Sequence, residues 1–245
     1  MGDEGSARVL AERMADGLRD IFDASLVAVV LHGSLTIGGF VSGRSDVDLL
    51  VVVEQPLSDQ DVTAARELGA RLIADQDPPV DLRIVTRASA AHPSRTPELE
   101  LYLRRSPSGE EDVDVKTAEP DLLVEFELAR AHGVPLVGAE PSTFIGAVPH
   151  TWITDLGDEV VAAWQQLTDD TAHAELMVLT SCRIWRFAVD GTFVSKSEAG
   201  RWALTREPSL YAVEGALRTR AGEHDVRVEP AEIGRVLARV REELR

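Results

Sequence analysis

The sequence predicts an α/β domain with a mixed sheet and flanking helices over residues 1–110, followed by an all-α helical bundle domain over residues 111–245. Two observations lead to this fold class. Short apolar runs alternate with helical patterns in the first part, and helical spacing of apolar residues dominates the remainder. A run of helices after an α/β unit favours a second domain that packs against the first, and the chain is long enough for both.

The first domain is expected to contain three strands and their helices. Its predicted elements are, in order, a helix over residues 7–22, strands over 24–31 and 46–53, a helix from residue 58 or 59 to about residue 74, and a strand over 80–85. Residues 88–97 look like a loop, and residues 98–105 fit either a short helix or a strand. The polar residues 106–112 form the candidate domain boundary.

The second domain is expected to be helical. Helices are predicted over residues 121–132, 154–167, 173–189, 196–204, 210–220 and 230–245, with a connector over residues 142–148. Gly133 follows the first of them, where glycine is favoured after a helix C-terminus. In the last helix, apolar residues occupy one side and several arginines the other, which predicts that the apolar side is buried.

Composition limits the classes of function. The formal net charge of −17 argues against nucleic-acid binding and suits a cationic small molecule, although ordinary solubility explains it equally well. No apolar run is long enough to cross a bilayer, and residues 1–4 lack the pattern of a secretory signal. We therefore expect a cytoplasmic protein without a membrane partner. Cys182, the single cysteine, is expected to be a buried, inert thiol.

One stretch, residues 31–54, carries the clearest functional signal. An apolar run ends at a Gly33-Ser34 turn, and after a glycine-containing loop a second apolar run opens with Asp46 and Asp48. Residues two apart on a strand point to the same side, so the two carboxylates project together. Mg²⁺ often joins one or two such carboxylates to substrate phosphates, which predicts a metal here with phosphates near the turn. The alternative is a solvated strand edge beside an ordinary turn.

The third predicted strand places Asp81 and Arg83 on one side. An acid inside a strand is disfavoured unless it has a partner or a task. From the residues alone, a salt bridge to a surface arginine and a functional carboxylate explain Asp81 equally well.

At these residues the chain resembles the nucleotidyltransferase superfamily related to DNA polymerase beta, whose signature is Gly-Ser, a spacer and Asp-x-Asp. It is also similar, nearly end to end, to the aminoglycoside adenylyltransferases that modify streptomycin and spectinomycin. That closer resemblance rests on residues 32–34, 45–51, 133–138, 178–185, 194–196 and 202–204. It implies a monomeric resistance enzyme that uses ATP and Mg²⁺ to adenylylate a cationic antibiotic in the cleft between its two domains.

The resemblance also implies roles for individual residues. Asp81 matches the third carboxylate, which accepts the proton of the attacking hydroxyl and completes the metal site with Asp46 and Asp48; relatives have glutamate there, one methylene longer. The implied nucleotide contacts are Gly33, Ser34, Ser45, Arg183 and Lys196, and the implied antibiotic contacts are Asp121, Trp164, Asp169 and His173. Without the resemblance, Asp121 reads as a helix N-cap, and a core position is the better explanation of Trp164.

Some positions depart from the relatives that accept streptomycin. Those relatives have a tryptophan where this chain has Arg104, and an acid where it has His173. A guanidinium repels a cationic ring system on which an aromatic would stack, and a neutral imidazole removes a charge partner. Relatives limited to spectinomycin lack the pair too, so the resemblance favours spectinomycin over streptomycin. A tyrosine near the nucleotide in some relatives is also absent, around Gly222.

Two other functions remain open. One is the same chemistry on another small-molecule or protein acceptor. The other is a non-catalytic nucleotide-binding protein of the antitoxin kind, against which the intact carboxylates and the full helical domain argue.

Overall fold

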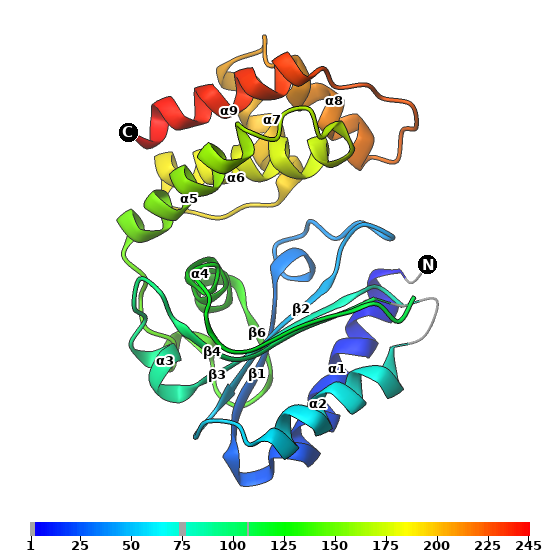
Figure 1. Cartoon of the computed structure of the whole chain (residues 1–245), viewed down its shortest axis with the longest axis vertical. Coiled ribbons are helices and arrows are strands. Elements are labelled where there is room, and N and C mark those ends of the chain that lie inside the picture. The colour runs from blue at the N-terminus through cyan, green and yellow to red at the C-terminus, as the bar shows by residue number, and fades with distance from the viewer. Residues whose placement is uncertain (1–2, 74–76, 107) are drawn as a thin grey trace. The chain divides into compact units, whose positions relative to one another are not determined.

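The structure, a computed structural model, describes residues 3–73, 77–106 and 108–245. Within these residues a six-stranded sheet, in the order β5-β4-β3-β2-β1-β6, organises the first part of the chain (Figure 1). The strands are β1 (Leu26–His32), β2 (Val47–Val53), β3 (Val80–Thr86), β4 (Glu98–Arg105), β5 (Glu111–Ala118) and β6 (Val134–Val137). β2 and β3 run parallel, whereas the other neighbouring pairs are antiparallel. The predicted mixed sheet is confirmed.

Helices cover both faces of this sheet. α1 (Glu4–Phe22) and α2 (Asp59–Leu72) lie on one face, and α4 (Leu122–His132) lies on the other, with the short α3 (Arg87–Ala91) after β3 (Figure 1). Val47, Leu49 and Val51 of β2 belong to the buried cluster shared with α1 and α2. Since side chains alternate along a strand, Asp48 faces the opposite side, toward α4.

Local signals set the ends of the predicted helices. Ser58 is the N-cap of α2: its hydroxyl accepts from the Asp61 amide, and the Asp61 carboxylate accepts from the Ser58 amide, which forms a capping box. α2 ends at Leu72. The end expected near residue 74 lies outside the described residues.

The predicted domain boundary at residue 110 is corrected by the strands that follow it. Residues 111–118 form β5 beside β4, and residues 134–137 form β6 beside β1. Both were missed because β5 is an exposed edge strand rich in acids and β6 is short and contains Pro135. The chain consequently divides into the compact units Met1–Val148 and Pro149–Arg245.

The second unit is helical, as predicted. Its helices are α5 (His150–Trp164), α6 (Ala174–Asp190), α7 (Lys196–Arg206), α8 (Tyr211–Arg220) and α9 (Pro230–Leu244). α6 contacts each of the other four and carries the fully buried Trp185. Cys182, also on α6, is fully buried, and burial raises the pKa of its thiol to about 12. None of the described helices is long and apolar enough to span a bilayer.

Candidate active site

A row of polar side chains crosses the sheet on the face opposite α1 and α2. In the strand register His32 lies beside Asp48, and Asp48 lies beside Asp81. Asp81 in turn pairs with Arg104 on β4. Residues paired directly across neighbouring strands point to the same face. Two acids that are distant in the sequence, Asp48 and Asp81, are thereby brought together, with Asp46 at the residue before β2.

The turn after β1 fits closely against this row. Gly33 has a φ of +66°, and a Cβ at this position would lie 2.0 Å from Asp48 Oδ2. A 3₁₀ turn starts at Gly33 in place of the helix that a phosphate site there would favour, and the buried Ser34 hydroxyl has no hydrogen-bond partner among the described residues. The Ser45 hydroxyl accepts a hydrogen bond from the Val41 amide at 2.9 Å and closes the loop before β2, and its contact with the nucleotide stays a prediction.

The electrostatics of Asp48 indicate an excess of buried negative charge. Burial raises the pKa of Asp48 well above its usual range, and the nearby carboxylates of Glu125, Asp81 and Asp46 raise it further. No group of three or more His, Cys, Asp or Glu side chains in the described parts of the chain is arranged to hold a metal by itself. Mg²⁺ commonly needs only one or two carboxylates together with substrate phosphates. The donor chemistry of Asp46 and Asp48 therefore fits a magnesium ion that is shared with a nucleotide.

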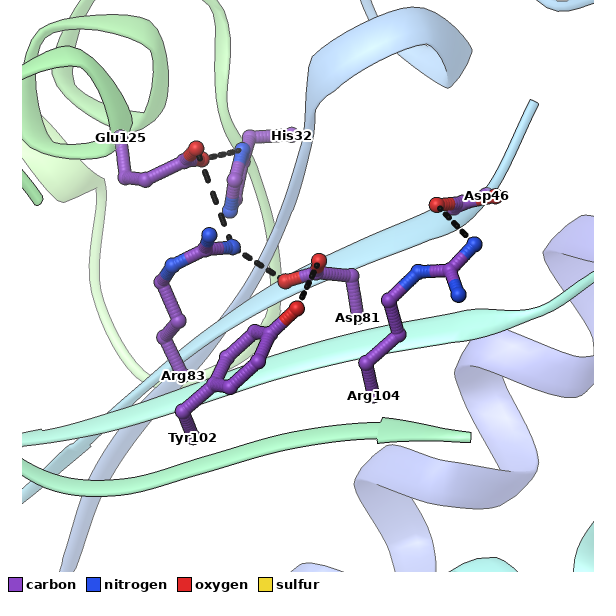
Figure 2. A network of polar contacts seen from close by, with 7 residues as sticks. All are labelled: His32, Asp46, Asp81, Arg83, Tyr102, Arg104 and Glu125. Carbon is purple, nitrogen blue, oxygen red and sulfur yellow. Dashed lines mark hydrogen bonds and ion pairs between the residues drawn. The ribbon is translucent and has the colours of Figure 1, made fainter. Parts of the chain in front are cut away.

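Asp81 lies within a network of polar side chains (Figure 2). Arg83 Nη1 forms an ion pair with Asp81 Oδ1, and the Tyr102 hydroxyl donates to Asp81 Oδ2 at 3.3 Å. The same Nη1 lies 3.8 Å from Glu125 Oε1 on α4, and Glu125 Oε2 lies 3.3 Å from His32 Nδ1. The salt bridge considered from the sequence exists, but the Arg83 side chain is only 12% exposed and so is not an ordinary surface arginine.

Burial determines the charge states in this network. It raises the pKa of Asp81 to about 6, and Glu125 and Asp46 contribute, against the opposing effects of Arg83 and the Tyr102 hydroxyl. Burial also lowers the pKa of His32 to about 3, with help from the Arg83 charge. Asp81 is therefore mostly ionised at neutral pH. His32 is neutral, so its contact with Glu125 is not a salt bridge.

Arg104 reaches the acid at the start of β2. Its Nη2 lies 3.4 Å from Asp46 Oδ2, and both side chains are partly exposed. Arg104 thus lies beside a predicted metal ligand, on the same row as Asp81.

The other predicted site residue of the first unit is Asp121. It occupies the N-cap position of α4, but its exposed carboxylate makes no capping hydrogen bond. Asp121 therefore lies at the predicted N-cap position, but capping does not explain why the residue there is an acid.

The remaining predicted residues belong to the second unit. Trp164 is partly buried and packs against the helical core, whereas Asp169 and His173 are exposed. His173 Nδ1 lies 2.7 Å from a carboxylate oxygen of Asp170, an acid that the sequence analysis did not consider.

Two cations of the second unit, Arg183 and Lys196, were expected at the nucleotide. The Arg183 guanidinium lies over the Phe193 ring, 5.4 Å from its centroid. Lys196 is the first residue of α7, after the N-cap Ser195. The aromatic partner of Arg183 was not predicted.

Four members of the network around Asp81 were not predicted as site residues: His32, Arg83, Tyr102 and Glu125. An acid on a largely apolar helix was the available signal for Glu125, since its neighbours Leu122 and Phe126 are buried. Tyr102 could not be placed because its segment fitted both a helix and a strand.

Comparison with known proteins agrees with this geometry. A family model described as a nucleotidyltransferase domain matches residues 11–132, and one described as the aminoglycoside adenylyltransferase C-terminal domain matches residues 143–242. An aminoglycoside (3'') (9) adenylyltransferase of Klebsiella pneumoniae is 32% identical over 200 residues, which are 77% of this chain and 75% of that protein. The chain belongs to the aminoglycoside adenylyltransferase family. The predicted family and enzyme class, an ATP-dependent adenylyltransferase, are thereby confirmed.

Two further proteins to which this chain is similar are named for spectinomycin. The spectinomycin 9-adenylyltransferase of Staphylococcus aureus is 27% identical over 203 residues, covering 78% of this chain and 75% of that protein. The crystal structure of a spectinomycin adenyltransferase from Enterococcus faecialis, with ATP and spectinomycin, has a TM-score of 0.74 at 19% identity. It matches 97% of this chain and 98% of that one, which shows a common fold.

Proposed function

We propose that the protein transfers AMP from ATP to a hydroxyl of an aminoglycoside or aminocyclitol antibiotic, with spectinomycin favoured over streptomycin. The observation that carries this proposal is the placement of Asp48 beside Asp81, against the Gly33 turn. Two carboxylates and a buried, unpartnered Ser34 hydroxyl in one place suit a magnesium-bound triphosphate.

In the proposed reaction the acceptor hydroxyl attacks the α-phosphorus of ATP, the bond to the bridging oxygen of the β-phosphate breaks, and pyrophosphate leaves. Asp81 accepts the proton of the hydroxyl, and a pKa of about 6 keeps it mostly ionised at neutral pH. Asp46 and Asp48 would hold Mg²⁺, which would neutralise charge on the phosphates when bound. Ser34 donates to a phosphate oxygen, and Arg183 and Lys196 add positive charge on the nucleotide.

We propose a more limited metal role for Asp81 than the sequence resemblance implied. Both of its oxygens have donors in the structure, Arg83 on one and Tyr102 on the other. We therefore assign the metal chiefly to Asp46 and Asp48, and proton acceptance to Asp81.

The antibiotic is proposed to contact Asp121, Trp164, Asp169 and His173. Carboxylates attract the ammonium groups of such an acceptor, and a net charge of −17 favours its approach. Arg104, which lies on the same row as Asp81, presents a cation where streptomycin-accepting relatives present an aromatic ring. This difference supports spectinomycin as the better substrate.

The test measures pyrophosphate release from Mg-ATP with spectinomycin, streptomycin and several other aminoglycosides, and identifies the AMP adduct by mass spectrometry. We expect release with spectinomycin and little with streptomycin. Asp81→Asn should lower kcat about 100-fold or more while the KM for ATP changes less than about twofold. Asp20→Asn, the same change at an exposed position of α1, is the matched control.

Each outcome tests a different part of the proposal. Equal turnover of both antibiotics would refute the specificity inferred from Arg104 and His173. Full activity of Asp81→Asn would remove it as the base. No release with any antibiotic would refute the proposed acceptor class.

A further inference from the structure

Arg83 lies between the buried Asp81 and the partly buried Glu125 on the polar face of the sheet (Figure 2). The side chains of Arg83 and Asp81 are each 12% exposed, and that of Glu125 is 16% exposed. Arg83 Nη1 contacts a carboxylate oxygen of both acids. A cation in this position satisfies charges that β3 and α4 bring into one small, poorly solvated volume.

The contacts of Asp81 define the orientation of its carboxylate. Arg83 engages Oδ1, and the Tyr102 hydroxyl donates to Oδ2, so each oxygen has one donor on a different side. The terminal torsion of an aspartate is soft, and a carboxylate without such partners samples a broad range of angles. Two donors restrict that range and leave the remaining lone pairs in a defined direction.

Arg83 is itself held from two sides. Its guanidinium lies over the Tyr102 ring, 4.9 Å from the centroid, which limits movement along the sheet. Glu125 approaches from α4 and places its Oε1 3.8 Å from Nη1 of the same guanidinium. A planar guanidinium presents its donors in a rigid fork and stacks flat on an aromatic face, whereas the ammonium of lysine is a compact charge on a flexible stem and fixes the carboxylate less well.

We propose that Arg83 is the positioning residue of Asp81, and that Glu125 acts through Arg83 to hold that carboxylate in its productive orientation. The inference rests on the proposed function, in which Asp81 accepts the proton of the antibiotic hydroxyl. It adds an ion-pair relay from α4 to β3 that supports the reacting group.

The experiment uses the full-length protein with Mg-ATP and spectinomycin, and compares Arg83→Met, Arg83→Lys, Glu125→Gln and the double variant Arg83→Met/Glu125→Gln. We expect kcat to fall about 100-fold in Arg83→Met and about tenfold in Glu125→Gln, while KM for ATP stays within about twofold. The kcat of Arg83→Lys should be about tenfold higher than that of Arg83→Met. The double variant should be no slower than Arg83→Met, because Glu125 acts through Arg83.

The control is another arginine–glutamate pair that joins two elements of the same unit. Arg87 Nε lies 2.7 Å from Glu54 Oε2, and about half of each side chain is exposed. Arg87→Met and Glu54→Gln should retain wild-type kcat. Circular dichroism and thermal unfolding of every variant separate a folding defect from a kinetic one, and if Arg83→Met does not fold, Arg83→Lys and Glu125→Gln decide.

Three results would overturn the inference in an active wild-type enzyme. The first is a wild-type kcat in Glu125→Gln. The second is a kcat of the double variant that has fallen by the product of the two single losses. The third is a rise in the KM for ATP of the Arg83 and Glu125 variants without a change in their kcat. If the wild-type protein adenylylates no antibiotic, the conclusion is different. That result refutes the proposed function and, with it, the reaction in which Arg83 would act.

Discussion

Replacing Gly33 by alanine changes the closest contact between the turn after β1 and the acids on β2. The new Cβ would lie 2.0 Å from Asp48 Oδ2 and 2.6 Å from Asp48 Cγ. Ordinary contacts between such atoms are about 3.5 Å, so the carboxylate or the turn must move by more than about 1 Å. A displacement of that size at a reacting centre costs on the order of 100-fold in rate.

The substitution also strains the backbone. Gly33 has a φ of +66°, a conformation that costs a residue with a side chain about 1 kcal/mol. For a protein of this length such a loss lowers Tm by about 2–4 °C. Gly33→Ala is therefore expected to lower Tm modestly and kcat for spectinomycin adenylylation about 100-fold.

Gly38 provides the matched control. It lies in the same loop region with a φ of +71°, and a Cβ there would meet nothing within 4 Å. Gly38→Ala should lower Tm to a similar extent and leave kcat within about twofold of wild type. The assays are pyrophosphate release and thermal unfolding.

If Gly33→Ala is as active as Gly38→Ala, the position of Asp48 does not limit turnover and its assignment as a metal ligand is refuted. If kcat falls by the same large factor in Gly33→Ala and Gly38→Ala, the rigidity of the loop controls turnover and the contact with Asp48 does not.

Two further predictions concern the buried titratable groups. The pKa of His32 falls from its usual 6.5 to about 3 on folding, so the unfolded state binds an additional proton between these values. The contribution of His32 to stability is therefore complete above about pH 6.5 and decreases by up to about 1.4 kcal/mol per pH unit on acidification. Urea unfolding at pH 7.5 and pH 5 should show a smaller stability loss in His32→Gln than in wild type; an identical loss would contradict the buried neutral imidazole. Cys182, whose pKa burial raises to about 12, should not react with a disulfide reagent at pH 8 until the protein is unfolded, and rapid labelling of the native protein would contradict its burial.

Most elements of the fold were predictable because their signal is local. The first two strands are nearly continuous apolar runs, the third alternates apolar with charged residues, and the helices show apolar residues at helical spacing. The secondary structure of β4 remained ambiguous because its short amphipathic segment fits both a helix and a strand. β5 was missed because it is an exposed edge strand that gains its stability from pairing with β4. Because β5 belongs to the sheet, the first unit extends beyond the boundary predicted at residue 110.

Some residues of the candidate site were likewise predictable from local sequence patterns, and others were not. Gly33, Ser34, Asp46 and Asp48 were recognised because they lie close together in one motif. Alternation placed Asp81 on the side of its strand shared with Arg83, and the family resemblance made it a candidate site residue. Glu125, on the fourth helix of the chain, could not be connected to them.

By itself the sequence determined which chemical groups are present and which side chains share a face of their own strand, because the alternation of a strand is a property of the local backbone. Only the tertiary structure decided that Asp48 lies beside Asp81, and that Arg83 contacts Glu125 as well as its near neighbour. Those pairings depend on the register between strands and on the rotation of α4 over the sheet. Both are set by the packing of residues far apart in the chain, which no local pattern encodes.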